Sequence, residues 1–253
     1  MEQLKSPSIS KERLDLLLYH RGLTESREKA KAIILSGSVL VDGKKISKAG
    51  VEVRVDANLR LLKPVSPYAS RGGIKLEAAL KAFKIDPSGC IAMDVGASTG
   101  GFTDCLLKHG VARVYAIDVG YGQLLWRLQQ DARVIVLDRQ NIRDLQGKMI
   151  PEEVDLATID VSFISLDKVI PSVVSRMKMG GILIALVKPQ FEVGKGRVGK
   201  GGIVKDATLR EEVRDRISNN GKAWGLDFFG TILSPITGQK GNIEYFIEFR
   251  KVR

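Results

Sequence analysis

The stretch Met93-Asp-Val-Gly-Ala-Ser-Thr-Gly-Gly-Phe-Thr-Asp104 decides which fold we expect. An apolar run leads into it and a pattern typical of a helix follows it, so it predicts a turn between a strand and a helix. Gly96, Gly100 and Gly101 let the backbone bend sharply there and let a ligand approach closely. Asp118 ends the next predicted strand, where a carboxylate can accept hydrogen bonds from ribose hydroxyls. The stretch therefore predicts a nucleoside-binding turn at the edge of an α/β sheet.

The ligand of this turn is predicted from two of its side chains. A dinucleotide fingerprint, G-x-G-x-x-G, needs a glycine at position 98, where Ser98 stands. Asp94, just before Gly96, would repel a pyrophosphate but could hold a cationic amino acid group, directly or through water. The pattern D-x-G-x-x-x-G therefore favours S-adenosylmethionine, a nucleoside with a sulfonium and an ammonium, over a dinucleotide. A glycine-rich turn that holds no ligand is the remaining alternative.

Further cofactor contacts are expected at the ends of neighbouring strands. Asp138 and Asn141 could meet the adenine region, although either residue could instead cap the segment that follows. The full set of expected cofactor-binding residues is Asp94, Gly96, Ser98, Thr99, Gly100, Gly101, Phe102, Asp118, Asp138, Asn141 and Asp160.

Strands and helices alternate from residue 71 onward. Near-continuous apolar strands between helices indicate a mostly parallel sheet covered on both faces, and the last two strands, with no helix between them, should pair antiparallel. The expected strands are 90–95, 113–117, 134–137, 154–159, 182–187, 226–233 and 243–249, and the expected helices after residue 98 are 99–109, 121–130, 165–179 and 208–219. The pattern predicts a Rossmann-like α/β fold with a seven-stranded sheet.

The start of the chain follows a different pattern, which predicts a small α+β domain. Ser10 could cap a first helix, and Thr24 could open a second one. Asp42-Gly43 is a strong hairpin signal, and valines then alternate as they do in a strand. Prolines stiffen the segment that follows. We therefore expect one domain at 1–63, a linker at 64–69 and a larger domain at 70–253.

The charge balance predicts a polyanionic partner. Lys and Arg number 40 against 29 Asp and Glu, a net charge of +11. Residues 1–64 carry a large share of that surplus, which solvated helix faces explain less well than a groove for a phosphate backbone does. A basic, glycine-rich segment at 195–205 could close over RNA or could be an ordinary surface loop. The residues expected to bind RNA are Arg13, Arg21, Arg27, Lys31, Lys44, Lys45, Lys195, Arg197 and Lys200.

Membrane and metal partners are not expected. The most apolar run, 180–187, is far shorter than the roughly 18–20 residues of a spanning helix. The first residues do not resemble a signal peptide, so we expect a cytoplasmic protein. Two cysteines and two histidines cannot build a zinc site alone.

Four ionisable residues stand next to predicted strands at informative places: Lys75, Asp160, Lys188 and Glu244. The carboxyl ends of parallel strands line the ligand crevice of an open α/β sheet, so Asp160 and Lys188 should lie near the cofactor. A lysine directly after an apolar strand is costly to bury without a partner, and Asp160 or Glu244 would supply one. An ordinary ion pair at a strand end is the alternative for each residue alone.

In order and context, these four residues resemble the K-D-K-E tetrad of FtsJ-like (RrmJ-like) ribose 2′-O-methyltransferases. The whole chain is similar to the TlyA/hemolysin A family, which joins an S4-type RNA-binding domain to an FtsJ-like methyltransferase domain. The segments Ser70-Arg-Gly-Gly-Ile-Lys-Leu76 and Lys188-Pro-Gln-Phe-Glu192 are specific to the resemblance. It implies a class I methyltransferase fold, S-adenosylmethionine as cofactor and the 2′-hydroxyl of cytidines in ribosomal RNA of the ribosomal subunits as substrate.

The chemistry of this reaction agrees with the residue types. Lys188, with its amine neutral at the moment of attack, would remove or polarise the hydroxyl proton. Asp160 and Glu244 would orient the lysines, and Lys75 would hold the hydroxyl or stabilise the developing alkoxide. No metal is required, because a sulfonium is already activated. A non-catalytic RNA-binding or ribosome-assembly factor and a haemolysin-type membrane-active protein are the alternatives, the latter without a visible spanning segment.

Overall fold

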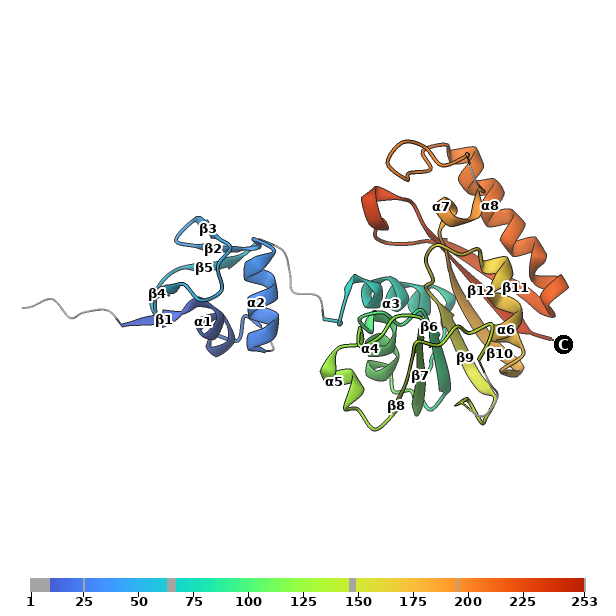
Figure 1. Cartoon of the computed structure of the whole chain (residues 1–253), viewed down its shortest axis with the longest axis horizontal. Helices are drawn as coiled ribbons and strands as arrows, with labels where there is room; N and C mark the ends of the chain where they lie inside the picture. Colours follow the sequence, from blue (N-terminus) through green and yellow to red (C-terminus); the bar gives the residue numbers. More distant parts are fainter. Residues whose placement is uncertain (1–9, 25, 63–66, 146–148, 195, 253) are drawn as a thin grey trace, which may run out of the picture. The chain divides into compact units, whose positions relative to one another are not determined.

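This computed structural model describes residues 10–24, 26–62, 67–145, 149–194 and 196–252. Its contacts divide the chain into two compact units, Met1–Val65 and Ser66–Arg253 (Figure 1). No helix of the described residues is long and apolar enough to cross a membrane. The same residues contain no group of three or more His, Cys, Asp or Glu side chains that could hold a metal ion.

The larger unit is built on a seven-stranded sheet in the order β11-β12-β10-β9-β6-β7-β8. The strands from β8 to β10 pair in parallel, whereas β12 pairs antiparallel with both β10 and β11. The strand bounds are β6 Ile91–Val95, β7 Arg113–Asp118, β8 Val134–Asp138, β9 Val154–Ile159, β10 Met177–Val187, β11 Leu226–Leu233 and β12 Tyr245–Lys251. The predicted mostly parallel sheet with an antiparallel end is confirmed.

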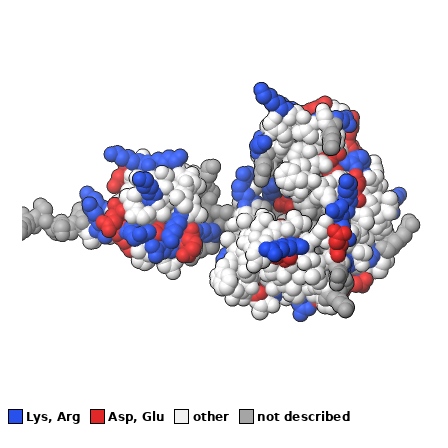
Figure 2. Space-filling view, in the orientation of Figure 1, with Lys and Arg blue, Asp and Glu red and all other residues white. Residues whose placement is uncertain are grey.

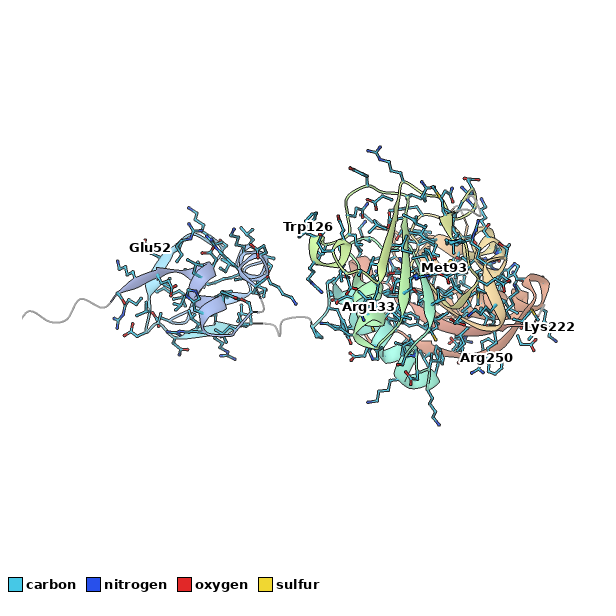
Figure 3. All side chains as sticks on the ribbon, turned by 90° about the horizontal axis from the view of Figure 1, so that it is seen from below. Glu52, Met93, Trp126, Arg133, Lys222 and Arg250 are labelled. Atoms are coloured by element: carbon cyan, nitrogen blue, oxygen red, sulfur yellow. The ribbon has the colours of Figure 1, made fainter. Side chains whose placement is uncertain are left out.

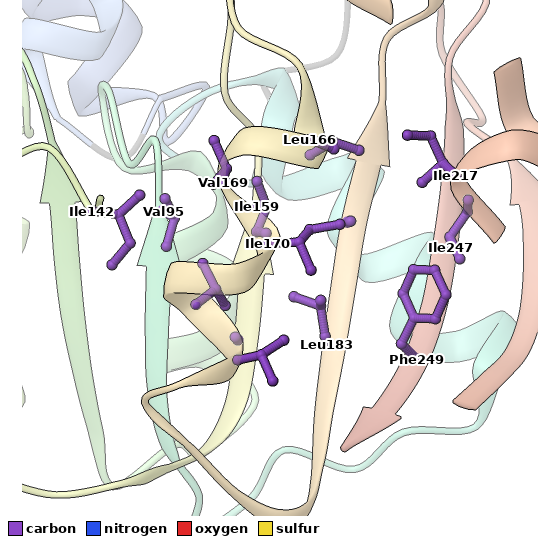
Figure 4. Close-up of a cluster of buried hydrophobic side chains, with 14 of the residues drawn as sticks. Val95, Ile142, Ile159, Leu166, Val169, Ile170, Leu183, Ile217, Ile247 and Phe249 are labelled. Atoms are coloured by element: carbon purple, nitrogen blue, oxygen red, sulfur yellow. The ribbon is translucent and has the colours of Figure 1, made fainter. Parts of the chain in front are cut away.

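Helices cover both faces of this sheet, because alternate strand residues are apolar on both sides. On one face, α3 and α4 pack against residues such as Ala92 and Ile184. On the other face, the segments around Ile170 and Ile217 pack against residues such as Leu183 (Figure 4). The helix bounds are α3 Arg71–Phe83, α4 Gly101–Lys108, α5 Trp126–Gln129, η2 Leu166–Lys168, α6 Ile170–Val174, α7 Pro189–Glu192, α8 Ala207–Asn220, η3 Gly221–Trp224 and η4 Gln239–Gly241.

Two predicted helices of this unit are much shorter than expected. The helix expected at 165–179 is confirmed only in its first part, as η2 and α6; the last part is wrong, because Met177 already pairs with Val154 as the first residue of β10. The strand register shifts between Met177 and Ile182, a stretch that contains Gly180 and Gly181. The helix expected near 121–130 is reduced to the four residues of α5.

In its described residues, 10–24 and 26–62, the smaller unit has two helices, a three-stranded sheet in the order β3-β2-β5 and a β1-β4 pair. The predicted Asp42-Gly43 turn is confirmed, with φ angles of 47° and 79° that suit a tight hairpin. Ser10 does not cap the first helix, because β1 lies between them, and Ser26 rather than Thr24 caps the second. The bounds are β1 Lys11–Arg13, α1 Leu14–His20, α2 Arg27–Leu35, β2 Val39–Val41, β3 Lys44–Ile46, β4 Glu52–Arg54 and β5 Leu59–Leu61.

Candidate active site

Two cavities meet at the carboxyl ends of β6 and β9. One has a volume of about 340 Å³ and the other of about 470 Å³, within the range of small-molecule sites. Both are lined by Gly96, Ser98 and Asp160, so they adjoin at the glycine turn. Lys75 lines the smaller cavity and Asp118 lines the larger one. An elongated ligand can therefore lie across the turn with one end in each cavity.

The glycine turn needs glycine for steric reasons. Gly96 has a φ of 88°, and a Cβ atom there would lie 2.6 Å from the carbonyl oxygen of Asp160. Gly100 precedes α4 with a φ of 93°, and its added Cβ would lie 2.3 Å from a methyl carbon of Leu128. A Cβ atom on Gly101 would lie 2.2 Å from the Ser70 hydroxyl oxygen. A larger residue at Gly96 would therefore push the turn away from the end of β9, and one at Gly100 or Gly101 would have to displace the side chain of Leu128 or Ser70.

The larger cavity contains the carboxylate expected for a ribose. Asp118 accepts hydrogen bonds from the backbone N–H of Ser98 at 2.7 Å and of Gly120 at 2.7 Å, which fixes the carboxylate at the cavity wall. Asn141 also lines this cavity. Asp138 accepts a hydrogen bond from the N–H of Gly122 at 2.8 Å and is not among the lining residues, which favours a role in shaping the loop. The apolar part of the wall comes from Val95, Ile117, Val119, Ile142, Val161, Phe163, Ile164 and Val169.

The remaining expected cofactor residues fall into two groups. Ser98, Thr99, Gly101 and Phe102 line the smaller cavity. Asp94 and Gly100 line neither cavity. Asp94 is fully buried and, like its neighbour Met93 (Figure 3), lies inside the unit.

The Asp94 carboxylate lies beneath the glycine turn. It accepts hydrogen bonds from the hydroxyls of Thr103 at 2.7 Å and Thr158 at 3.1 Å. Burial raises the pKa of Asp94 to about 7, although these two hydrogen bonds oppose the rise. The structure therefore gives Asp94 a role in holding strand, turn and α4 together, whereas a contact with a ligand ammonium would need a water or a shift of the turn.

The four predicted tetrad residues form two ion pairs. The Lys75 ammonium lies 2.5 Å from a carboxylate oxygen of Glu244, and both side chains are nearly buried. The Lys188 ammonium lies 2.5 Å from a carboxylate oxygen of Asp160 and donates a hydrogen bond to the Ser162 hydroxyl at 3.0 Å. Of the two carboxylates that could have paired with Lys188, the structure therefore selects Asp160.

The sheet register explains why Lys188 and Glu244 lie at one edge. Because β12 runs antiparallel to β10, its first residue lies at the carboxyl end of β10, and Val187 pairs with Tyr245. The residue after β10 and the residue before β12 are therefore both at this edge. Asp160 follows β9, which pairs in parallel with β10, and so reaches the same edge.

This arrangement suits proton handling beside a nucleoside. Asp160 and Lys75 line the smaller cavity, and each has a partner of opposite charge within direct contact. A buried charge is tolerated only with such a partner, and the partner also fixes the direction of the side chain. The site therefore has one oriented amine in the cavity wall, that of Lys75, and a second, that of Lys188, which lines neither cavity and pairs with the Asp160 carboxylate that lines both.

The residues expected to bind RNA differ in how far their side chains are already held by contacts within the protein. Arg13 and Arg27 both contact the fully buried carboxylate of Asp15, at 3.0 and 2.8 Å. Arg21 donates hydrogen bonds to the carbonyl oxygens of Ala57 and Val55. These three arginines therefore hold the fold of the smaller unit together as well as presenting charge.

Other cations are more exposed. Lys44 and Lys45 are exposed on the hairpin, and Lys31 is partly exposed on α2. Figure 2 shows lysine and arginine side chains over much of the visible face of this unit, with acidic side chains between them. In the basic loop, Arg197 pairs with Glu212 at 3.3 Å and Lys200 is exposed, whereas Lys195 lies outside the described residues.

Several residues of the site were not predicted from the sequence. Ser162 contacts Lys188, and Arg71, Thr237 and Gly238 line the smaller cavity. Arg71 lies in the segment Ser70–Leu76, which carried the family resemblance, and this position is the signal from which its place in the site could have been predicted. Thr237 and Gly238 come from the loop between β11 and β12, which only the folded sheet brings to this edge.

Comparison with known proteins places the chain in a class. The family model described as FtsJ-like methyltransferase matches residues 68–251, and the model described as S4 domain matches residues 12–59. The sheet and the glycine turn are thus those of a methyltransferase. The chain belongs to the FtsJ-like methyltransferase family, and it carries an S4 domain before the enzyme domain.

Individual relatives agree with this placement. The chain is 44% identical over 94% of its length to "16S/23S rRNA (cytidine-2'-O)-methyltransferase TlyA" of Mycobacterium tuberculosis, of which it covers 89%. It is 41% identical over 94% of its length to "Hemolysin A" of Brachyspira hyodysenteriae, of which it covers 99%. A solved structure, "Putative hemolysin from Streptococcus thermophilus", matches 97% of this chain and 90% of its own with a TM-score of 0.75 at 40% identity.

Proposed function

We propose that this methyltransferase transfers the methyl group of S-adenosylmethionine to the 2′-hydroxyl of a cytidine in ribosomal RNA. The observation that carries the proposal is the pair of contacts Lys75–Glu244 and Lys188–Asp160 at two adjoining cavities, of which Lys75 lines the smaller and Asp160 lines both. The name of the relative from Mycobacterium tuberculosis supports this substrate. A protein acting on ribosomal RNA would work in the cytoplasm.

The cavities fit the proposed cofactor. Asp118 can accept hydrogen bonds from ribose hydroxyls in the larger cavity, and Asn141 lies where the adenine would be held. The close approach of the Gly96 turn to Asp160 leaves room for the sulfonium end only because residue 96 has no side chain. When bound, S-adenosylmethionine supplies a methyl group that is already activated toward attack.

The residues of the tetrad would divide the remaining work. Lys188 in its neutral form takes the proton from the ribose hydroxyl, while Asp160 and Ser162 hold the amine in position. Lys75, fixed by Glu244, donates a hydrogen bond to the oxygen that becomes negative as it attacks. The hydroxyl oxygen forms a bond to the methyl carbon as the carbon–sulfur bond breaks.

The smaller unit would recognise RNA. It matches the S4 domain model, and it carries exposed cations at Lys44 and Lys45. Phosphate contacts from such residues position RNA without reading its sequence, which leaves the choice of nucleotide to the enzyme domain. We place the domains at 1–63 and 70–253 with a linker at 64–69.

Methyl transfer to ribosomal RNA from a strain that lacks the gene tests the proposal. The wild-type protein should incorporate radiolabelled methyl groups, and mass spectrometry should map them to ribose 2′-oxygens. Lys188→Ala should lose about 10²–10⁴-fold in rate, the usual contribution of general-base catalysis, while binding of S-adenosylmethionine by calorimetry stays nearly intact. Lys178→Ala is the matched control, because Lys178 pairs with Asp155 at the opposite end of β10.

Two outcomes would refute the proposal. Normal turnover by Lys188→Ala would remove its role as base. RNA binding without methyl transfer to any ribosomal RNA would favour a non-catalytic ribosome-assembly factor instead.

A further inference from the structure

Glu192 is buried although it lies at the end of the short helix α7, just outside the tetrad. Its side chain is only 2% exposed. One carboxylate oxygen accepts the backbone N–H of Leu166 at 2.8 Å. The other accepts the Ser165 hydroxyl at 2.7 Å and the Arg216 guanidinium at 3.0 Å. Three donors on two other segments thus converge on one carboxylate.

These contacts join the two segments that carry one half of the tetrad. Glu192 follows Lys188 on the chain segment that leaves β10, whereas Ser165 follows Asp160 on the segment that leaves β9. A second contact, between the rings of Phe163 and Phe191 at 5.0 Å, joins the same two segments. The distance between the Lys188 amine and the Asp160 carboxylate therefore depends on how firmly these segments are held together.

Arg216 connects this junction to the helix α8. Its guanidinium contacts both Glu192 and Asp167, and Asn220 on the same helix donates a hydrogen bond to Asp167 at 3.0 Å. Because α8 packs into the core through Val213 and Ile217, the guanidinium has a fixed anchor. A buried carboxylate with a fixed cation and two further donors is a rigid connection rather than a loose surface pair.

We propose that Glu192 and Arg216 are positioning residues that set the Lys188–Asp160 geometry. The inference rests on the proposed function, because it assigns Lys188 the handling of a hydroxyl proton. Neither residue lines either of the two cavities of the candidate active site, so both would act through others. A displacement of about 1 Å at a reacting group can cost about 10²-fold in rate, so a weakened connection should lower the rate of methyl transfer more than cofactor binding.

The test compares Glu192→Gln with Glu211→Gln, a control at an exposed glutamate of α8. Glutamine keeps the size of the side chain and can still accept the Leu166 N–H, but it loses the charge that pairs with Arg216. With S-adenosylmethionine and ribosomal RNA, we expect kcat of Glu192→Gln to fall about 10–100-fold. We expect KM for S-adenosylmethionine to stay within about twofold and the control to match the wild type.

A second background separates positioning from general support of the fold. Ser162→Ala removes only the hydroxyl that contacts Lys188. If Glu192 works by bringing this segment to Lys188, adding Glu192→Gln to Ser162→Ala should reduce kcat less than it does in the wild type. Circular dichroism and thermal unfolding of each variant measure the folded fraction.

Each result decides the question. Wild-type kcat in Glu192→Gln overturns the inference, and so does a loss that follows the folded fraction and is equal in both backgrounds. A wild-type protein that methylates no ribosomal RNA overturns the proposed function instead. A loss of kcat in a folded variant, reduced in the Ser162→Ala background, supports the inference.

Discussion

Replacing Asp94 with asparagine should stabilise the protein at alkaline pH. The carboxylate is fully buried, and its two hydrogen bonds come from the neutral hydroxyls of Thr103 and Thr158. No cation compensates the charge in the contacts described for it, and burial raises its pKa to about 7. An asparagine side chain has nearly the same shape as that of aspartate and carries no charge, so Asp94→Asn removes the cost of burying the ion.

The size of the effect follows from the pKa. A rise from 3.8 to about 7 corresponds to roughly 4 kcal/mol, at about 1.4 kcal/mol per pH unit. In the unfolded chain the group loses its proton near pH 3.8, whereas in the folded protein it keeps the proton until about pH 7. The folded state therefore binds the extra proton between these values, and stability falls as the pH rises through this window. Above about pH 7, the full free-energy cost of burying the ionised carboxylate remains.

Urea unfolding at pH 5 and pH 8 measures this difference. Both tryptophans, Trp126 and Trp224, lie in the larger unit, so their fluorescence reports the unfolding of the unit that contains Asp94. We expect Asp94→Asn to exceed the wild type by a few kcal/mol at pH 8, with a smaller advantage at pH 5. An equal difference at both pH values, or a less stable variant at pH 8, would refute the assignment of a buried charge.

The same variant tests the expected ligand contact of Asp94. If its charge also attracts the ammonium of S-adenosylmethionine, Asp94→Asn should lose roughly 1.5–3 kcal/mol of binding free energy, as for a hydrogen bond to a charged group. Calorimetry at pH 8 measures this loss. Unchanged affinity would leave Asp94 with a structural role only.

Three further predictions concern the turn, the tetrad and the RNA contacts. Gly96→Ala should reduce S-adenosylmethionine affinity at least tenfold by calorimetry, because its Cβ would lie 2.6 Å from a carbonyl oxygen; unchanged affinity would place the cofactor elsewhere. Gly238→Ala should lower kcat roughly 10–100-fold. The added Cβ would lie 1.9 Å from a carboxylate oxygen of Glu244 and would displace this carboxylate, which pairs with Lys75. A folded variant with normal kcat would contradict this prediction. Removing the charges of Lys44 and Lys45 together should weaken RNA binding and make the slope of log affinity against log salt concentration shallower by about 1–2. Binding titrations at several salt concentrations measure this slope. An unchanged slope would mean that the hairpin does not contact phosphates.

Much of the larger unit could be predicted because its signals are local. Apolar runs lead to Asp94 and to Asp118, and the structure has the strands β6 and β7 at these places. The first residues of β10 could not be predicted in this way. Met177 becomes a strand residue by pairing with Val154, a contact that the local pattern does not contain.

The smaller unit shows the same limit. Lys11 pairs with Arg54, so the chain before the first helix is a strand and not the helix start that Ser10 suggested. Charge counting also overstated how freely the arginines present charge. Arg13 and Arg27 share the buried Asp15, a carboxylate whose pKa they hold well below its usual range.

At the tetrad, the sequence limited the partners but could not choose between them. Strand ends placed Asp160 and Lys188 at one edge, and the antiparallel return of β12 added Glu244 to it. Lys75 comes from α3, and it takes the Glu244 carboxylate while Lys188 takes Asp160. Two separate pairs keep each amine directed by its own acid.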